Sequence, residues 1–137
     1  MPIAVEELTV GQELEPVVKH MSLEKMRRPL MSGSNPIHFD PEFAQKAGLP
    51  APIATGVMSS AYLCEMLAKA FGVEWIRGGF LDVKFIRPIY AGDTVTARGR
   101  ITGTTETSTG RRVLLDVWCE TQRGEPVTVG AASVVWH

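Results

Sequence analysis

The residues best suited to chemistry in this chain lie in two short segments. The first, Ser32–Asp40, reads Ser-Gly-Ser-Asn-Pro-Ile-His-Phe-Asp, and the second, Pro52–Gly56, reads Pro-Ile-Ala-Thr-Gly. His38 is the one side chain in the first segment that exchanges protons near neutral pH. Gly56 directly precedes the apolar run 57–71, so a helix starting there would offer unpaired amides to a developing oxyanion, and a glycine would let the ligand approach closely. Together they suit proton transfer beside a carbonyl group.

Both assignments have a plainer alternative. A single histidine is more often a hydrogen-bonded structural residue than a catalyst, and Gly56 could serve only the tight turn into the helix. Neither Gly33 nor Ser34 can take a proton from water at neutral pH, so His38 would have to act as base and acid in turn.

Three further side chains could supply a base or a nucleophile. Asp40 is expected to cap a helix, which would lower its pKa and make it a poor base. Glu65 lies within the apolar run, where burial could raise its pKa, but an exposed pair with Lys69 four residues later is the preferred interpretation. Cys64 is expected to be a packing thiol.

The elements that position these residues follow from turn and capping signals. A short strand within Gly11–His20 leads to Ser22, which could cap a short helix that runs through Arg28. Asp40 followed by proline begins a small helix that ends near Gly48. The run 57–71 is apolar on nearly every face, so it predicts a helix wrapped by other elements.

The wrapping would come from the second half of the chain, where four β-rich runs are separated by short turns. These runs are Gly79–Tyr90, Thr94–Glu106, Arg112–Thr121 and Pro126–Trp136. Apolar residues alternate in the second and third runs, which would place one face of the sheet on the helix. The sequence predicts an α+β domain over 1–137, with a curved antiparallel sheet around a central apolar helix at about 57–71.

The composition excludes several classes of function. The 137 residues fit one domain, and 45% hydrophobic residues with 21% charged residues are ordinary for a globular protein. A formal net charge of -1 gives no bulk reason to bind nucleic acid. The two cysteines lack metal spacing, and no leader, membrane span or nucleotide motif is visible. We expect a cytoplasmic protein without metal or other cofactor.

Three segments resemble the signature of the MaoC-like (R)-specific enoyl-CoA hydratases and dehydratases. The family pattern Gly-Asp-x-Asn-Pro-Leu/Ile-His corresponds to the residues that end at His38, and Pro-Ile-x-His-Gly corresponds to Pro52–Gly56. Lys84–Val95 is similar to the strand-turn-strand signature of the family. The resemblance runs from about Val10 onward and implies the hot-dog fold, in which the sheet encloses the helix.

The resemblance also implies roles for individual residues. In this family an aspartate and a histidine act on one water, while an amide at the helix N-terminus holds the enolate oxygen, so His38 and Gly56 are the expected catalytic residues. The spacing places Gly33 where the aspartate stands, and Thr55 where a histidine is usual. The expected substrate-binding residues are Asn35, Gly33, Ser34, Thr55 and Arg87.

The charge of Arg87 would suit the phosphates of CoA or of a carrier-protein pantetheine, although a solvated strand face explains it equally well. Asn35 is expected chiefly to fix its loop through hydrogen bonds to the backbone.

Three functions stay open at this point. The first is an acyl-thioester hydro-lyase of fatty acid metabolism with an altered dyad, acting on a CoA or acyl-carrier substrate. The second is a non-catalytic subunit that shapes the acyl pocket for a dyad-bearing paralogue. The third is a hot-dog thioesterase that uses Glu65 as its base. A homodimer that continues one sheet into the next is expected, because it would cover the exposed edge strands.

Overall fold

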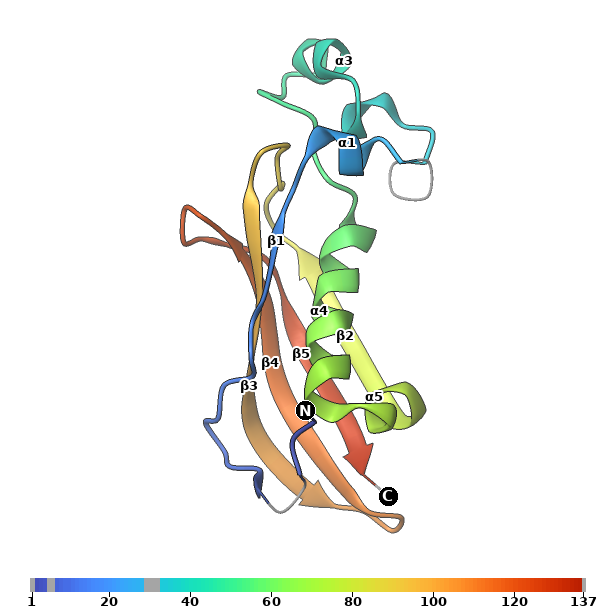
Figure 1. The fold of residues 1–137 in the computed structure, drawn as a ribbon, viewed down its shortest axis with the longest axis vertical. Coiled ribbons are helices and arrows are strands. Elements are labelled where there is room, and N and C mark those ends of the chain that lie inside the picture. The colour runs from blue at the N-terminus through green and yellow to red at the C-terminus, as the bar shows by residue number, and fades with distance from the viewer. Residues whose placement is uncertain (1, 5–6, 29–32, 137) are drawn as a thin grey trace.

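The longest helix, α4 (Gly56–Phe71), lies along one face of a curved antiparallel sheet (Figure 1). The computed structural model describes residues 2–4, 7–28 and 33–136. The helix predicted over 57–71 is confirmed and begins one residue earlier, at Gly56. It ends at Gly72, whose φ of 62° lies in the left-handed region that favours glycine.

The sheet has five strands in the order β1-β3-β4-β5-β2, and every neighbouring pair is antiparallel. The strands are β1 (Val17–His20), β2 (Gly79–Phe85), β3 (Thr94–Glu106), β4 (Arg111–Thr121) and β5 (Pro126–Trp136). This is the predicted hot-dog arrangement, with a curved sheet against a central helix. The order leaves β1 and β2 at the two edges of the sheet.

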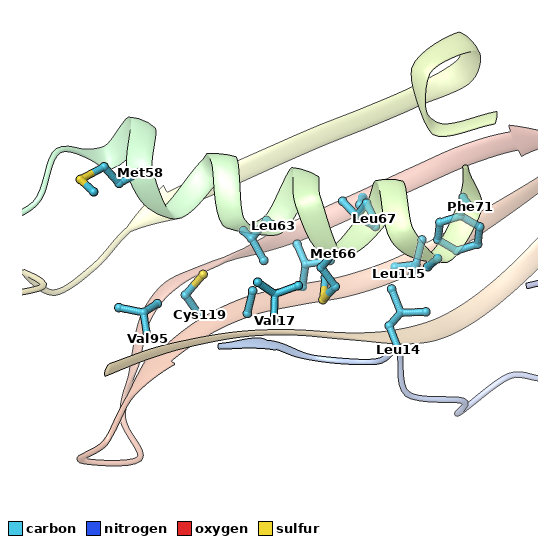
Figure 2. Close-up of a cluster of buried hydrophobic side chains, with 14 of the residues drawn as sticks. Leu14, Val17, Met58, Leu63, Met66, Leu67, Phe71, Val95, Leu115 and Cys119 are labelled. Atoms are coloured by element: carbon cyan, nitrogen blue, oxygen red, sulfur yellow. The ribbon is translucent and has the colours of Figure 1, made fainter. Parts of the chain in front are cut away.

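The core lies between α4 and the sheet (Figure 2). Leu63, Met66 and Leu67 of the helix are fully buried, and so are the alternating apolar residues of β3 and β4. Those strand residues are Val95, Ala97, Ile101, Val113, Leu115, Val117 and Cys119. The predicted alternation is therefore confirmed, and the burial of so many apolar side chains supplies most of the driving force that holds helix and sheet together.

Two parts of the second half differ from the prediction. The strand predicted over Gly79–Tyr90 ends at Phe85, because the amides of Ile86 and Arg87 both donate to the carbonyl of Val127 and Pro88 has no amide hydrogen. A short helix, α5 (Val73–Gly78), also lies between α4 and β2, where no element was predicted. It packs on β5, a contact that local sequence patterns do not reveal.

Short helices precede α4. Ser22 caps α1 (Leu23–Met26), and Asp40 caps α3 (Pro41–Lys46), both as predicted. Between them, η2 (Pro36–His38) is a single 3₁₀ turn capped by Asn35. The predicted turn over 32–36 lies partly outside the described residues, since Ser32 is not among them. None of the described helices is long and apolar enough to cross a membrane.

Candidate active site

A cavity of about 390 Å³ opens at the N-terminus of α4. Residues from four separate parts of the chain line it, among them His38, Thr55, Gly56, Ser59, Arg87 and Thr128. Four of the residues predicted from the sequence are thus brought together: His38, Thr55, Gly56 and Arg87. The other three, Gly33, Ser34 and Asn35, lie on the exposed loop before η2 and do not line this cavity.

The two predicted motifs are joined directly to each other. The side-chain oxygen of Asn35 accepts a hydrogen bond from the Ile37 amide at 3.2 Å, which starts the turn that carries His38. The carbonyl of Ile37 then accepts from the Ile53 amide at 3.0 Å. The loop-fixing role predicted for Asn35 has a concrete form here, because its cap shapes the turn that brings His38 beside the second motif.

The orientation of His38 follows from one hydrogen bond. Its Nδ1 lies 2.8 Å from the carbonyl oxygen of Ile53. A carbonyl oxygen can only accept, so Nδ1 carries the proton and the lone pair of the neutral ring lies on Nε2. Nε2 is therefore the atom that can take a proton from a bound water.

The first turn of α4 has no side-chain cap. Thr55 occupies the N-cap position, yet its hydroxyl makes no capping hydrogen bond, and its Oγ1 is buried without a partner among the described residues. The leading amides of a helix have no acceptor within the helix. Because the Thr55 hydroxyl does not cap them, they are available to an oxygen that enters the cavity, where the helix dipole also favours negative charge.

Packing also favours glycine at position 56. A Cβ atom at this position would lie 2.7 Å from two ring atoms of Phe85, which forms part of the cavity wall. Contacts that short do not occur, so any other residue must displace the ring. Phe85 is 56% exposed at the end of β2, and its ring can therefore move without breaking the core.

A buried polar chain forms the floor of the cavity. Thr128 and Ser59 are each 1% exposed, and the Thr128 hydroxyl donates to Ser59 Oγ at 3.0 Å. Ser59 Oγ in turn donates to the carbonyl of Gly56 at 3.2 Å. These bonds tie the first turn of α4 to β5, and the strand register places Phe85 directly opposite Thr128. The amides at Gly56 are thereby held at a fixed position above the sheet.

The sequence did not single out Ser59, Thr128 or Phe85. Ser59 and Thr128 are 69 residues apart, and their contact depends on how β5 is placed against α4. A usable signal did exist for Ser59 and Thr128. Each is a polar residue within an otherwise apolar segment, and a polar side chain that is buried needs a hydrogen-bond partner.

The two carboxylates considered as alternative bases, Asp40 and Glu65, do not line the cavity. The Asp40 carboxylate accepts from the amides of Glu42 and Phe43, as expected for a helix cap. Glu65 bonds to Lys19 of β1 at 3.2 Å, so the predicted pair with Lys69 is wrong: the neighbouring strand supplies a partner closer than the helix does. No acidic residue lines the cavity among the residues that the structure describes.

The thiol of Cys64 does not suit nucleophilic chemistry. It is half-buried, and burial raises its pKa, which keeps the sulfur protonated near neutral pH. Arg87 lies at the rim of the cavity, where it donates to the carbonyl of Pro126 at 2.6 Å and lies 3.5 Å from the carboxylate of Glu125. About half of its side chain is exposed and can meet a ligand at the rim.

Comparisons with known proteins agree with this geometry. A family model described as "MaoC like domain" matches residues 16–119. The chain is 32% identical over 62 residues to the peroxisomal multifunctional enzyme type 2 of Mus musculus; the match covers 44% of this chain and 8% of that protein, so the chain spans less than a tenth of this relative.

Two solved structures resemble the whole chain. The (R)-hydratase from A. caviae involved in PHA biosynthesis has a TM-score of 0.79 and 23% identity, covering 97% of this chain and 100% of that one. The ChsH1-ChsH2 complex from Mycobacterium tuberculosis has a TM-score of 0.76 and 15% identity, covering 94% of this chain and 98% of that one. At these identities the likeness establishes the fold.

Proposed function

Because the chain belongs to the family of MaoC-like domains, we propose that it is a hydratase or dehydratase that acts on an acyl thioester. It adds or removes water across the C2–C3 bond of an acyl group carried by CoA or by an acyl carrier protein. The observation that carries the proposal is the single cavity that His38 and the N-terminus of α4 line together.

Hydration of an enoyl thioester needs a base for water, an acid for C2 and donors for the enolate oxygen. Nε2 of His38 takes a proton as the water oxygen bonds to C3. The electron pair of the C2–C3 double bond then forms a double bond between C1 and C2, and the carbonyl pair moves to the thioester oxygen. The leading amides of α4, at Gly56, hold that oxyanion. Nε2–H then returns its proton to C2, and the thioester carbonyl re-forms. Dehydration follows the same steps in reverse.

The bond between His38 and Ile53 serves both halves of this cycle. In the neutral ring it fixes the tautomer with the lone pair on Nε2. Once Nε2 is protonated, the same carbonyl oxygen stabilises the imidazolium through Nδ1–H. One histidine can therefore carry both transfers, although the cavity lacks a carboxylate.

The remaining predicted residues would act on substrate binding. Arg87, at the rim, would meet the anionic part of the carrier, and Thr55 would border the thioester at the helix start. Asn35, with Gly33 and Ser34, would shape the loop above the cavity. Phe85 offers an apolar wall to the acyl chain.

The test is turnover by the purified protein. Enoyl-CoA esters and 3-hydroxyacyl-CoA esters of several chain lengths should interconvert, and His38→Ala should lower kcat/KM about a hundredfold or more. His20→Ala is the matched control, because His20 is exposed on β1 and lies outside the cavity. The proposal fails if no ester reacts, or if the two histidine variants lose activity equally.

A second candidate is a non-catalytic subunit of a heteromeric hydratase. It is favoured by one observation: the cavity contains His38 but no acidic residue from the described part of the chain. The similarity to the ChsH1-ChsH2 complex fits this candidate as well. Activity that appears only after a second MaoC-like chain is added would support it. Turnover by this chain alone would exclude it.

The thioesterase alternative depended on Glu65. That carboxylate bonds to Lys19 and does not line the cavity, so no observation favours this activity. We further propose that the chain forms a homodimer through an edge of its sheet, as many edge strands are covered in this way.

A further inference from the structure

Thr55 carries a buried hydroxyl group directly before the first turn of α4. Its Oγ1 makes no hydrogen bond within the described part of the chain. A buried polar atom that loses its bonds to water and gains none in the protein is destabilising, so its presence calls for an explanation. The cavity at Gly56 supplies one, because Thr55 is among the residues that line it.

Helix capping does not explain this hydroxyl. A threonine at the N-cap usually accepts a hydrogen bond from the amide of the second or third helical residue. In α4 the third of these amides, at Met58, already donates to the backbone carbonyl of Thr55 at 3.1 Å, and the hydroxyl makes no capping bond. The backbone therefore begins the helix without help from the Thr55 side chain.

The hydroxyl can turn without breaking a hydrogen bond. Rotation about χ1 moves the hydroxyl and the methyl group of a threonine between staggered positions, and no bond holds Oγ1 of Thr55 in its present one. The side chain as a whole is half-buried and is not enclosed in the core. A ligand that places an acceptor oxygen beside Thr55 would therefore attract the hydroxyl toward it.

In the proposed reaction, the thioester oxygen is that acceptor. The amide of Gly56 follows Thr55 in the chain, so an oxygen bound by this amide is next to the residue that carries the hydroxyl. Sites that stabilise an oxyanion combine backbone amides with side-chain donors. We propose that the Thr55 hydroxyl donates to the thioester oxygen and joins the Gly56 amide in holding the enolate. This role rests on the proposed function, since it needs a thioester in the cavity, and it makes Thr55 a catalytic residue.

Thr55→Val should change stability and catalysis in opposite directions. Valine is close to threonine in shape but has no polar atom, so the free protein loses an unpartnered hydroxyl and its melting temperature should rise by about 2 °C or more. The kcat for enoyl-CoA hydration should fall about tenfold or more, because one donor to the enolate is lost. Thr55→Ser keeps the hydroxyl and should keep most of the activity. A hydroxyl with only a structural role would stabilise the free protein, and its removal would lower the melting temperature.

Two unreactive ligands test the contact without turnover. Butyryl-CoA has the thioester oxygen but no C2–C3 double bond, whereas S-butyl-CoA is a thioether that lacks this oxygen. In calorimetric titrations of the whole protein, Thr55→Val should bind butyryl-CoA about fivefold or more weakly and S-butyl-CoA unchanged. Thr121→Val is the matched control, because Oγ1 of Thr121 is also buried without a partner among the described residues but does not line the cavity. It should leave both affinities unchanged.

The proposal is overturned if Thr55→Val weakens both ligands equally, leaves the affinity for butyryl-CoA unchanged or lowers the melting temperature. Failure of millimolar butyryl-CoA to bind to the unmodified protein would overturn it as well. Should Thr55→Val fail to fold, Thr55→Ala is compared with Thr55→Ser in the same titrations. A protein that binds butyryl-CoA through Thr55 but converts no enoyl ester would contradict the proposed reaction alone, so the two proposals can fail separately.

Discussion

Gly33 has a φ of 58°, and a Cβ atom added to it would have no heavy atom within 4 Å. The left-handed region favours glycine, but among other residues aspartate and asparagine enter it most readily. The family pattern places a carboxylate at this position, five residues before His38. The backbone and the surrounding space would therefore accept an aspartate, at a cost of about 1 kcal/mol in folding stability.

We predict that Gly33→Asp raises enoyl-CoA hydration by about tenfold or more, because the family pattern has at this position the aspartate that acts with the histidine on one water. Gly33→Asn is the matched control, since it has nearly the same shape and backbone tolerance but cannot accept the proton. Initial rates with a panel of enoyl-CoA esters measure the effect. Equal rates for the two variants would contradict the prediction.

Single residues also show which features of the site could be predicted from the sequence. His38 and Gly56 could be placed near each other because both belong to motifs with recognisable spacing. The carbonyl of Ile53, which sets the tautomer of His38, could not be predicted, since a backbone acceptor has no residue type that marks it. The bond between Thr128 and Ser59 depends on the placement of a strand 69 residues away, which local patterns do not encode.

At the scale of elements, the local sequence patterns correctly predicted the features that depend on neighbouring residues in the chain. The apolar run of α4, the alternation in β3 and the cap of α3 were all predicted correctly. The end of β2 and the helix α5 were missed, because both are decided by contacts with β5. A contact between elements also explains the wrong prediction for Glu65. Its carboxylate pairs with Lys19 of β1 and not with Lys69, which lies one turn later on α4.

The turn between β2 and β3 depends on Asp93, which is 4% exposed. Its carboxylate accepts from the Tyr90 amide, from the Gln122 amide group and from both terminal nitrogens of Arg123. Burial alone would raise the pKa of Asp93, but the hydrogen bonds from Arg123, Gln122 and Tyr90 outweigh it and hold the pKa below its ordinary value of 3.8.

A lowered pKa makes this turn sensitive to acid. The stabilisation is complete above the unfolded pKa near 3.8 and is lost as the pH falls through the lower folded pKa. We predict that Asp93→Asn lowers the free energy of unfolding by about 2 kcal/mol at pH 7, and that this difference shrinks below pH 3.8. Urea midpoints between pH 7 and pH 2.5 measure it. Glu42→Gln, in an exposed pair, should change little, and a constant difference for Asp93→Asn would contradict the prediction.

At the scale of the whole molecule, the two edges of the sheet differ in their surroundings. The edge strand β2 carries Phe80, which is 63% exposed, and the adjacent helix α5 carries Ile76, which is 76% exposed. Phe85 and Ile86, at the end of β2, are also exposed and border the cavity. An edge with unpaired backbone groups and so much apolar surface is suited to pairing with another copy of the chain.

The proposed homodimer therefore uses the β2 edge, which would place the two cavities beside the interface. We predict that Phe80→Glu converts the dimer to a monomer, because it buries a carboxylate in an apolar contact, and that its melting temperature then depends less on protein concentration. Val18→Glu is the matched control, since Val18 is 59% exposed on β1 at the opposite edge. Analytical ultracentrifugation of the three proteins measures the change. A monomeric unmodified protein, or equal dissociation of both variants, would assign β2 no part in assembly, and the apolar edge would then have to serve another contact.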